Sequence, residues 1–159
     1  MEFKELMALF GEQCGVGALE VDENGVAAIQ ADETRLSFME LPTTRQLVLF
    51  AEIAALPEAG REKLYEALLM AQYVGAALDG ATFALSPDGE LMLQRFDALV
   101  DLDLAKFATV VESFLNQVDK WREIVTAYRP DEAPAETKAA EEEMPQNLGL
   151  GGNPGFLSV

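Results

Sequence analysis

The sequence predicts a single α+β domain in which an antiparallel sheet packs against helices, in the order α-β-β-β-α-β-β-α. Two patterns carry most of this prediction. Residues 82–96 indicate a β-hairpin, because alternating apolar residues flank Ser86-Pro87-Asp88-Gly89, whose proline and glycine stand where a type I turn favours them. Residues 103–128 follow with an apolar residue at every third or fourth position, which is the pattern of a helix with one buried face.

The first part of the chain predicts one short helix and two strands. Residues 3–14 show helical spacing of apolar side chains and end at glycines. The Asn-Gly pair at 24–25 is typical of a tight turn. Strands are expected over 26–31 and 35–41, joined by a short polar loop.

Residues 46–56 are compatible with a strand or a helix. As a strand both faces are apolar, and as a helix Thr44 would cap the first turn. We favour a strand, because the run is rich in β-branched and aromatic residues and stops at Pro57. A strand that is apolar on both faces needs cover on both. The domain's own helix supplies one cover, and the other could be a partner.

The second part of the chain predicts a helix on each side of the hairpin. Residues 58–78 carry an apolar stripe, and Gly80 is expected just beyond the end of that helix. Asp101 or Asp103 is expected to cap the last helix, which Pro130 terminates. Trp121 lies on the stripe of the last helix, so we expect it in the core, with a subunit or client contact as the alternative.

A change of composition divides the chain into a domain at 1–129 and a C-terminal tail at 130–159. The tail is acidic and proline-punctuated to about residue 145, and then glycine-rich with a few large apolar residues. This composition predicts disorder. The alternative is that the apolar end docks on a groove of its own or of a neighbouring subunit.

The charge and the residue types exclude several functions. The net charge is −17, which disfavours nucleic acid and anionic membranes as partners. The charge either only keeps the protein soluble and dispersed, or it suits a basic client or protects exposed apolar grooves from self-association. Histidine is absent, and the one cysteine excludes an internal disulfide. We expect Cys14 to be a buried small apolar residue.

No pattern predicts a catalytic site, a metal site or a cofactor. The paired carboxylates, such as Asp101 with Asp103, fall in expected caps, turns and tail, where solvation and capping explain them. Asp22-x-Asn24 lacks the later ligands of a calcium loop. The start of the chain has no signal-peptide pattern, and no apolar run is long enough to span a bilayer. We therefore expect a soluble, cytoplasmic protein that is not an enzyme.

The order of elements resembles the class I chaperones of bacterial type III secretion, the Tir-chaperone or CesT-like family. The resemblance covers roughly residues 1–129. It rests on Asp22–Gly25 leading into strands that end at Leu56-Pro57, on the hairpin at 85–93, and on the spacing of Phe107, Phe114 and Trp121 in the last helix. Small size and acidity fit the same family.

The resemblance implies a homodimer without catalytic activity or cofactor, in the bacterial cytoplasm. It implies binding the N-terminal segment of a secreted effector in extended form, which keeps that effector soluble and secretion-competent. Main-chain and alternate side-chain contacts suit varied clients. Candidate client contacts, for which plain core packing is the alternative, are Phe3, Leu6, Phe10, Leu36, Phe38, Val48 and Phe50. Candidate dimer contacts, by family analogy, are Leu69, Tyr73, Phe83, Leu85, Leu91 and Leu93.

Two rival functions stay open at this point. One is a small ligand-binding or regulatory α+β domain with no client protein. The other is an enzyme that works with carboxylates alone. A client chaperone differs from both because it is recovered with a non-globular polypeptide segment.

Overall fold

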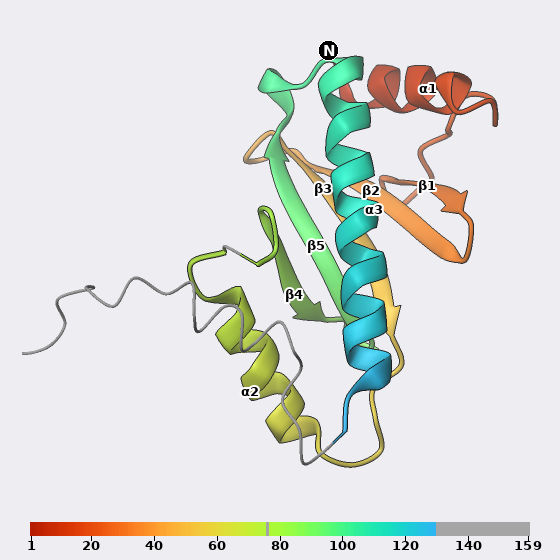
Figure 1. The fold of residues 1–159 in the computed structure, drawn as a ribbon. Coiled ribbons are helices and arrows are strands. Elements are labelled where there is room, and N and C mark those ends of the chain that lie inside the picture. The colour runs from red at the N-terminus through yellow and green to blue at the C-terminus, as the bar shows by residue number, and fades with distance from the viewer. Residues whose placement is uncertain (76, 130–159) are drawn as a thin grey trace, which may run out of the picture.

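The predicted element order is confirmed in the computed structural model, which describes residues 1–75 and 77–129 (Figure 1). Within these residues the chain forms an α+β fold. The helices are α1 (Phe3–Gln13), α2 (Arg61–Gln72) and α3 (Leu104–Ala127), with short 3₁₀ turns η1 (Tyr73–Gly75) and η2 (Leu99–Asp101). The strands are β1 (Val26–Ala31), β2 (Thr34–Leu41), β3 (Gln46–Ala54), β4 (Ala81–Leu85) and β5 (Leu91–Ala98).

The strands form one sheet in the order β1-β2-β3-β5-β4, and every neighbouring pair is antiparallel. The second arm of the hairpin therefore lies in the middle of the sheet, between β3 and β4. In Figure 1 α3 runs across the sheet along its whole length, α1 lies near the start of α3, and α2 lies beside β4. The edges of the sheet are β1 and β4.

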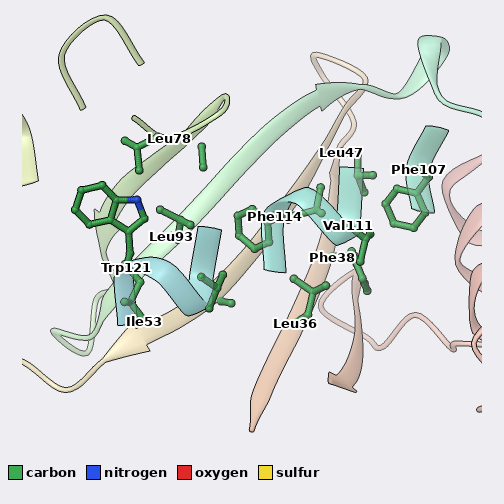
Figure 2. Close-up of a cluster of buried hydrophobic side chains, with 14 of the residues drawn as sticks. Leu36, Phe38, Leu47, Ile53, Leu78, Leu93, Phe107, Val111, Phe114 and Trp121 are labelled. Atoms are coloured by element: carbon green, nitrogen blue, oxygen red, sulfur yellow. The ribbon is translucent and has the colours of Figure 1, made fainter. Parts of the chain in front are cut away.

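The core lies between α3 and one face of the sheet. Figure 2 shows Trp121, Phe114 and Phe107 of α3 among apolar side chains of the strands, such as Leu93 and Leu47. The Phe107 ring meets the Phe10 ring of α1 at 4.8 Å and the Phe38 ring of β2 at 5.5 Å, both edge-on. Edge-on packing of this kind adds to the gain from apolar burial. Trp121 is fully buried, so its predicted place in the core is confirmed.

Several local predictions are confirmed. Residues 46–54 form strand β3 and not a helix. In the hairpin turn the Gly89 N–H donates to the Ser86 carbonyl at 2.9 Å, as in a hydrogen-bonded β-turn, and Gly89 has φ +83°. The Asp103 carboxylate accepts the Lys106 N–H at 2.8 Å and so caps α3. These features depend on neighbouring residues, which the sequence shows directly.

The prediction of a helix over 58–78 is wrong at both ends. Helix α2 begins at Arg61, after Gly60 with φ +75°, and ends at Gln72. Val74 and Gly75 then both have positive φ, which stops the helix. Gly80 lies inside a separate turn, which the Ala81 N–H closes by donating to the Leu78 carbonyl at 2.9 Å. It is therefore not the residue beyond the end of α2.

The C-terminal half of α3 is fastened to two distant segments. The Arg122 side chain donates to the main-chain carbonyls of Ile53 at 2.9 Å and Glu52 at 3.2 Å, where the β3–β5 register shifts. The Tyr128 hydroxyl donates to the Gly60 carbonyl at 3.0 Å, so the end of α3 lies beside the start of α2. Residues 130–159, where a tail was predicted, lie outside the described residues.

Candidate functional site: two apolar surfaces

The first apolar surface lies on α2, η1 and β4. Leu69 is 64% exposed and Val74 is 71% exposed, and Tyr73 and Leu85 are also exposed. Large apolar side chains gathered in this way typically mark an interaction site. We call the surface made by Leu69, Tyr73, Val74 and Leu85 the α2–β4 face.

A hydrogen bond from α2 shapes this face. The Gln72 side-chain oxygen accepts the Phe83 N–H at 2.6 Å, which occupies a main-chain donor at the free edge of β4. A partner that paired with β4 as an added strand would compete for this group. The α2–β4 face is therefore suited to side-chain packing against another surface.

Two shallow pockets meet on the α2–β4 face. They share Tyr65 and Leu69. The pocket between α2 and β4 has a volume of about 340 Å³. Its other lining residues are Leu68, Phe83, Ala84, Leu85 and Leu91. The second pocket continues along α2, where Glu62, Glu66, Met70 and Tyr73 line it. Together these side chains form an apolar groove, and Glu62 and Glu66 make its border along α2 acidic.

Val74 gives this face a strained backbone. Its φ of +64° lies in the left-handed region, which a β-branched residue rarely adopts. Such conformations cost roughly 1–3 kcal/mol and occur where function or the surrounding structure requires them. The Val74 side chain is exposed in the described chain. It therefore gains no free energy of apolar burial that would offset the cost of this backbone conformation.

The predicted dimer contacts divide between this face and the core. Leu69, Tyr73 and Leu85 are exposed on the α2–β4 face, and Phe83 lines its pocket while its ring packs on Trp121 at 4.8 Å. Leu91 and Leu93 are buried beneath them. No contact between copies is observed, so the dimer assignment stays a prediction, in which Leu91 and Leu93 act as support.

The second apolar surface lies on the sheet, on the opposite side from the core. The strand register aligns Met39 of β2, Val48 of β3 and Phe96 of β5 in one row, with Phe50 two residues beyond Val48. Side chains alternate along a strand, so these residues face away from Phe38, Leu49 and α3. Phe96 is 42% exposed, Met39 and Phe50 are half-buried, and Val48 is buried at 4% exposure. We call the surface made by Met39, Val48, Phe50 and Phe96 the open sheet face.

Most of the predicted client contacts are buried in the core. The residues concerned are Phe3, Leu6 and Phe10 of α1 and Leu36 and Phe38 of β2. Their alternative, plain core packing, describes their place in this structure, because α1 and α3 cover the sheet face from which Leu36 and Phe38 project. Val48 is buried as well, at 4% exposure, although it lies on the open sheet face, and Phe50 on that face is half-buried. No observation tests client contact, which stays a prediction.

The sequence analysis did not select Phe96, Met39 or Val74. The first two could have been found, because alternation along β5 and β2 places them opposite residues expected in the core. Val74 carries no such signal, since its backbone conformation depends on how α2 joins β4. The open sheet face therefore follows from strand periodicity, and the strained end of α2 does not.

Polar side chains serve the structure at the joint between β5 and α3. Arg95 contacts the Asp97 carboxylate at 2.9 Å and the Asp79 carbonyl at 2.9 Å, and the Ser113 hydroxyl donates to the Asp79 carboxylate. Within residues 1–75 and 77–129, no group of three or more His, Cys, Asp or Glu residues could hold a metal ion. Over the same part of the chain, no helix is both long and apolar enough to cross a membrane.

Cys14 is exposed, so the prediction of a buried residue is wrong. Helix α1 ends at Gln13 and Cys14 is its C-cap, so the side chain lies past the last turn that packs on the core. Partial burial raises the pKa of the Cys14 thiol above its ordinary value. A raised pKa lowers the thiolate fraction at neutral pH and so disfavours a reactive nucleophile.

Comparisons with solved structures find the same fold in several protein complexes, one of which contains a type III secretion chaperone, SycH. The ExsC–ExsE complex matches with a TM-score of 0.65 and 19% identity, over 79% of this chain and 97% of that one. The complex of SycH with a fragment of YscM2, from Yersinia pestis, matches with a TM-score of 0.58 and 21% identity, over 75% and 98%. The ExoT–SpcS complex of Pseudomonas aeruginosa matches with a TM-score of 0.53 and 18% identity, over 76% and 98%.

No curated protein matches the chain closely enough to identify a relative. The family comparison is more direct, because the model of the Tir chaperone protein (CesT) family matches residues 5–122. This range includes nearly all of the described fold, from α1 to the tryptophan turn of α3. The chain therefore belongs to the Tir chaperone protein (CesT) family.

Proposed function

We propose that this protein is a cytoplasmic type III secretion chaperone without enzymatic activity. It binds the N-terminal segment of a secreted effector in extended form and keeps it soluble and secretion-competent. Family membership supports this function, and one solved structure of the same fold is the type III secretion chaperone SycH in complex with a fragment of YscM2. The single structural observation that carries the proposal is the open sheet face.

The open sheet face has the chemistry of a client surface. Met39, Val48 and Phe96 form an apolar row across three strands, in which Phe96 is exposed, Met39 is half-buried and Val48 is buried, and Phe50 extends the row along β3. A client segment lying across this row would bury apolar side chains without needing a fixed sequence. Many modest contacts are needed, because ordering an extended segment costs entropy.

A homodimer through the α2–β4 face leaves the open sheet face free. Leu69, Tyr73 and Leu85 make the centre of this proposed dimer contact, and Phe83 lines the groove between them. The negative charge of the chain then keeps molecules with two such apolar surfaces from associating further. The ligand-binding alternative is not favoured, since the pocket between α2 and β4 is lined by apolar and aromatic side chains, with the Tyr65 hydroxyl as the one polar side-chain group.

Co-expression with the secreted proteins encoded beside its gene tests this function. We expect one of them to be recovered with the protein in a stable complex through its N-terminal segment. Phe50→Asp and, at the more exposed position, Phe96→Asp should each lower recovery at least tenfold, because each buries a charge against the client. Thr109→Asp adds the same charge on the exposed side of α3 and should leave recovery unchanged.

Circular dichroism and light scattering separate loss of function from loss of fold. Both sheet variants should keep the helical signal and the dimer mass of the native protein. If Phe96→Asp is folded and captures the client as well as Thr109→Asp does, the open sheet face is not the client surface. If no secreted protein is recovered and the native chain is a monomer, the chaperone proposal is wrong.

A further inference from the structure

The open sheet face needs an occupant before a client arrives. Phe96 is 42% exposed, and Met39 and Phe50 are half-buried, while Val48 between Met39 and Phe96 is buried at 4% exposure. Among the described residues, α1 and α3 pack on the other face of the sheet, and α2 packs beside β4 (Figure 1). An apolar surface left in water is a site of unwanted association. The chain itself contains a segment with the matching chemistry.

That segment is the end of the sequence beyond the acidic run. From Met144 to Val159 there is no charged residue, and Leu148, Leu150, Phe156 and Leu157 are its large apolar residues. Leu148 and Leu150 have the two-residue spacing that places both side chains on one side of an extended chain. The acidic run before them, which has three glutamates at 141–143, would stay in water.

The attachment point of this segment allows it to reach the open sheet face. Arg122 donates to the carbonyls of Glu52 and Ile53 on β3, just past Phe50. Helix α3 continues from Arg122 to Ala127, and two further residues reach Arg129. The distance from Arg129 to Phe50 is therefore roughly 30 Å or less, counted as five helical residues, two extended residues, one side chain and a few strand residues. The chain from Arg129 to Leu148 spans up to about 63 Å when extended, which exceeds this distance.

We propose that residues 148–157 cover the open sheet face of their own domain while no client is bound, and that a client displaces them. This inference rests on the proposed function, since it gives the client surface a second, internal occupant. The α2–β4 face is the less suitable target, because a second copy of the chain is its proposed occupant. Its groove is also bordered by Glu62 and Glu66, which would repel the acidic run.

Charge makes this cover weak and gives it a distinctive salt dependence. The chain as a whole carries −17, so the acidic run and the domain repel each other. Salt screens such repulsion, so we expect added salt to strengthen the internal cover. A basic client would show the opposite dependence, because salt screens its attraction to the acidic domain.

Paramagnetic broadening in NMR spectra tests the cover in the full chain. A spin label is attached at Ser158→Cys in a Cys14→Ser background, which leaves one thiol. We expect at least a twofold loss of amide signal at Met39, Val48, Phe50 and Phe96 relative to the reduced label, increasing with salt. Adding Phe156→Ser and Leu157→Ser should restore these signals, and the matched control Met144→Ser should not.

Three results would overturn the inference. The broadening could be confined to α2 and β4, which would place the segment on the proposed dimer face. It could be equally strong in isotope-labelled chains that carry no spin label and are mixed with spin-labelled chains, which would place the segment on a second copy. It could be absent altogether. Client recovery is measured separately by co-expression. Broadening at the open sheet face without recovery of any client supports the internal cover and counts against the proposed function. Recovery of a client without broadening supports the proposed function and overturns the internal cover.

Discussion

Helices α3 and α2 place their apolar side chains differently. On α3 the stripe through Phe107, Phe114 and Trp121 is buried against the sheet of the same chain. On α2 the inward residue Leu68 is buried at 3% exposure, while its neighbour Leu69 is 64% exposed. The apolar stripe of α3 is therefore buried within the domain, whereas some apolar residues of α2 remain exposed to solvent.

This difference separates residues that make the fold from residues that act between molecules. Burial of a large apolar side chain contributes about 1.5–3 kcal/mol to folding, and α3 gains this along its whole stripe. Leu69, Tyr73 and Val74 gain little of it in the described chain, and Val74 adds backbone strain. Changes on α3 should therefore affect stability, and changes on the exposed side of α2 should affect association.

The largest effect is expected for Trp121→Ala. Trp121 is fully buried and its ring packs edge-on against Phe83 at 4.8 Å, so its removal leaves a cavity between α3 and the hairpin. We expect a loss of about 3–5 kcal/mol in the free energy of unfolding, measured by urea denaturation at fixed protein concentration. This is a large share of the stability of an ordinary domain.

Trp121→Phe is the matched control for this prediction. The indole N–H of Trp121 has no hydrogen-bond partner among the described residues, so replacing it by phenylalanine removes ring volume without breaking a hydrogen bond. We expect a cost clearly below that of the alanine variant, about 1–2 kcal/mol. If Trp121→Ala and Trp121→Phe lower the free energy of unfolding equally, the indole N–H has a hydrogen-bond partner, and that bond contributes more to stability than the packing of the ring.

The contrast between the helices also explains how much the sequence could predict. The stripe of α3, its Asp103 cap and the Ser86–Gly89 turn depend on residues close together in the chain, and all were predicted. Strand alternation could also have identified Phe96, which was overlooked. The end of α2 depends on how its last turn reaches β4, where Gln72 binds the Phe83 main chain. That contact is between distant residues, so the sequence pattern alone continued the helix too far.

The site was harder to predict than the fold, for a related reason. Phe38 and Phe50 look equivalent in the sequence, since each is an aromatic residue in a strand. The structure places Phe38 under α3 and Phe50 on the open sheet face, and this depends on which side of the sheet α1 and α3 occupy. Periodicity shows that two residues share a face, but it does not show which face the helices cover.

The next largest effect is expected for Leu69→Asp, which tests the exposed side of α2. We expect the dimer dissociation constant to rise at least a hundredfold, because a charge would be buried in the proposed contact. The free energy of unfolding should change by about 0.5 kcal/mol or less, as for an ordinary surface change. Sedimentation gives the association constant, and urea denaturation of the monomer gives the stability.

Leu68→Asp is the control on the same helix. Its side chain is 3% exposed, so the same charge should prevent folding or lower stability by several kcal/mol. If Leu69→Asp unfolds the protein as Leu68→Asp does, the α2–β4 face belongs to the core. If Leu69→Asp remains a dimer of unchanged affinity, copies associate through another surface.

The smallest effect is expected for Val74→Gly, which separates strain from contact on the α2–β4 face. Glycine adopts positive φ without the cost of about 1–2 kcal/mol that a side chain carries there, although it gains freedom in the unfolded chain. In a monomeric Leu69→Asp background we expect a net gain of about 1 kcal/mol, seen as a rise of about 3 °C in Tm. Val74→Ala keeps the strain and loses the exposed side chain, so it should not raise Tm.

In the dimeric protein both variants should weaken association severalfold, because both remove an apolar side chain that is 71% exposed in the single chain. A lower Tm for glycine than for alanine would show that the surrounding structure does not impose strain at Val74, and the exposed side of α2 would then lose one of the two features that distinguish it from α3.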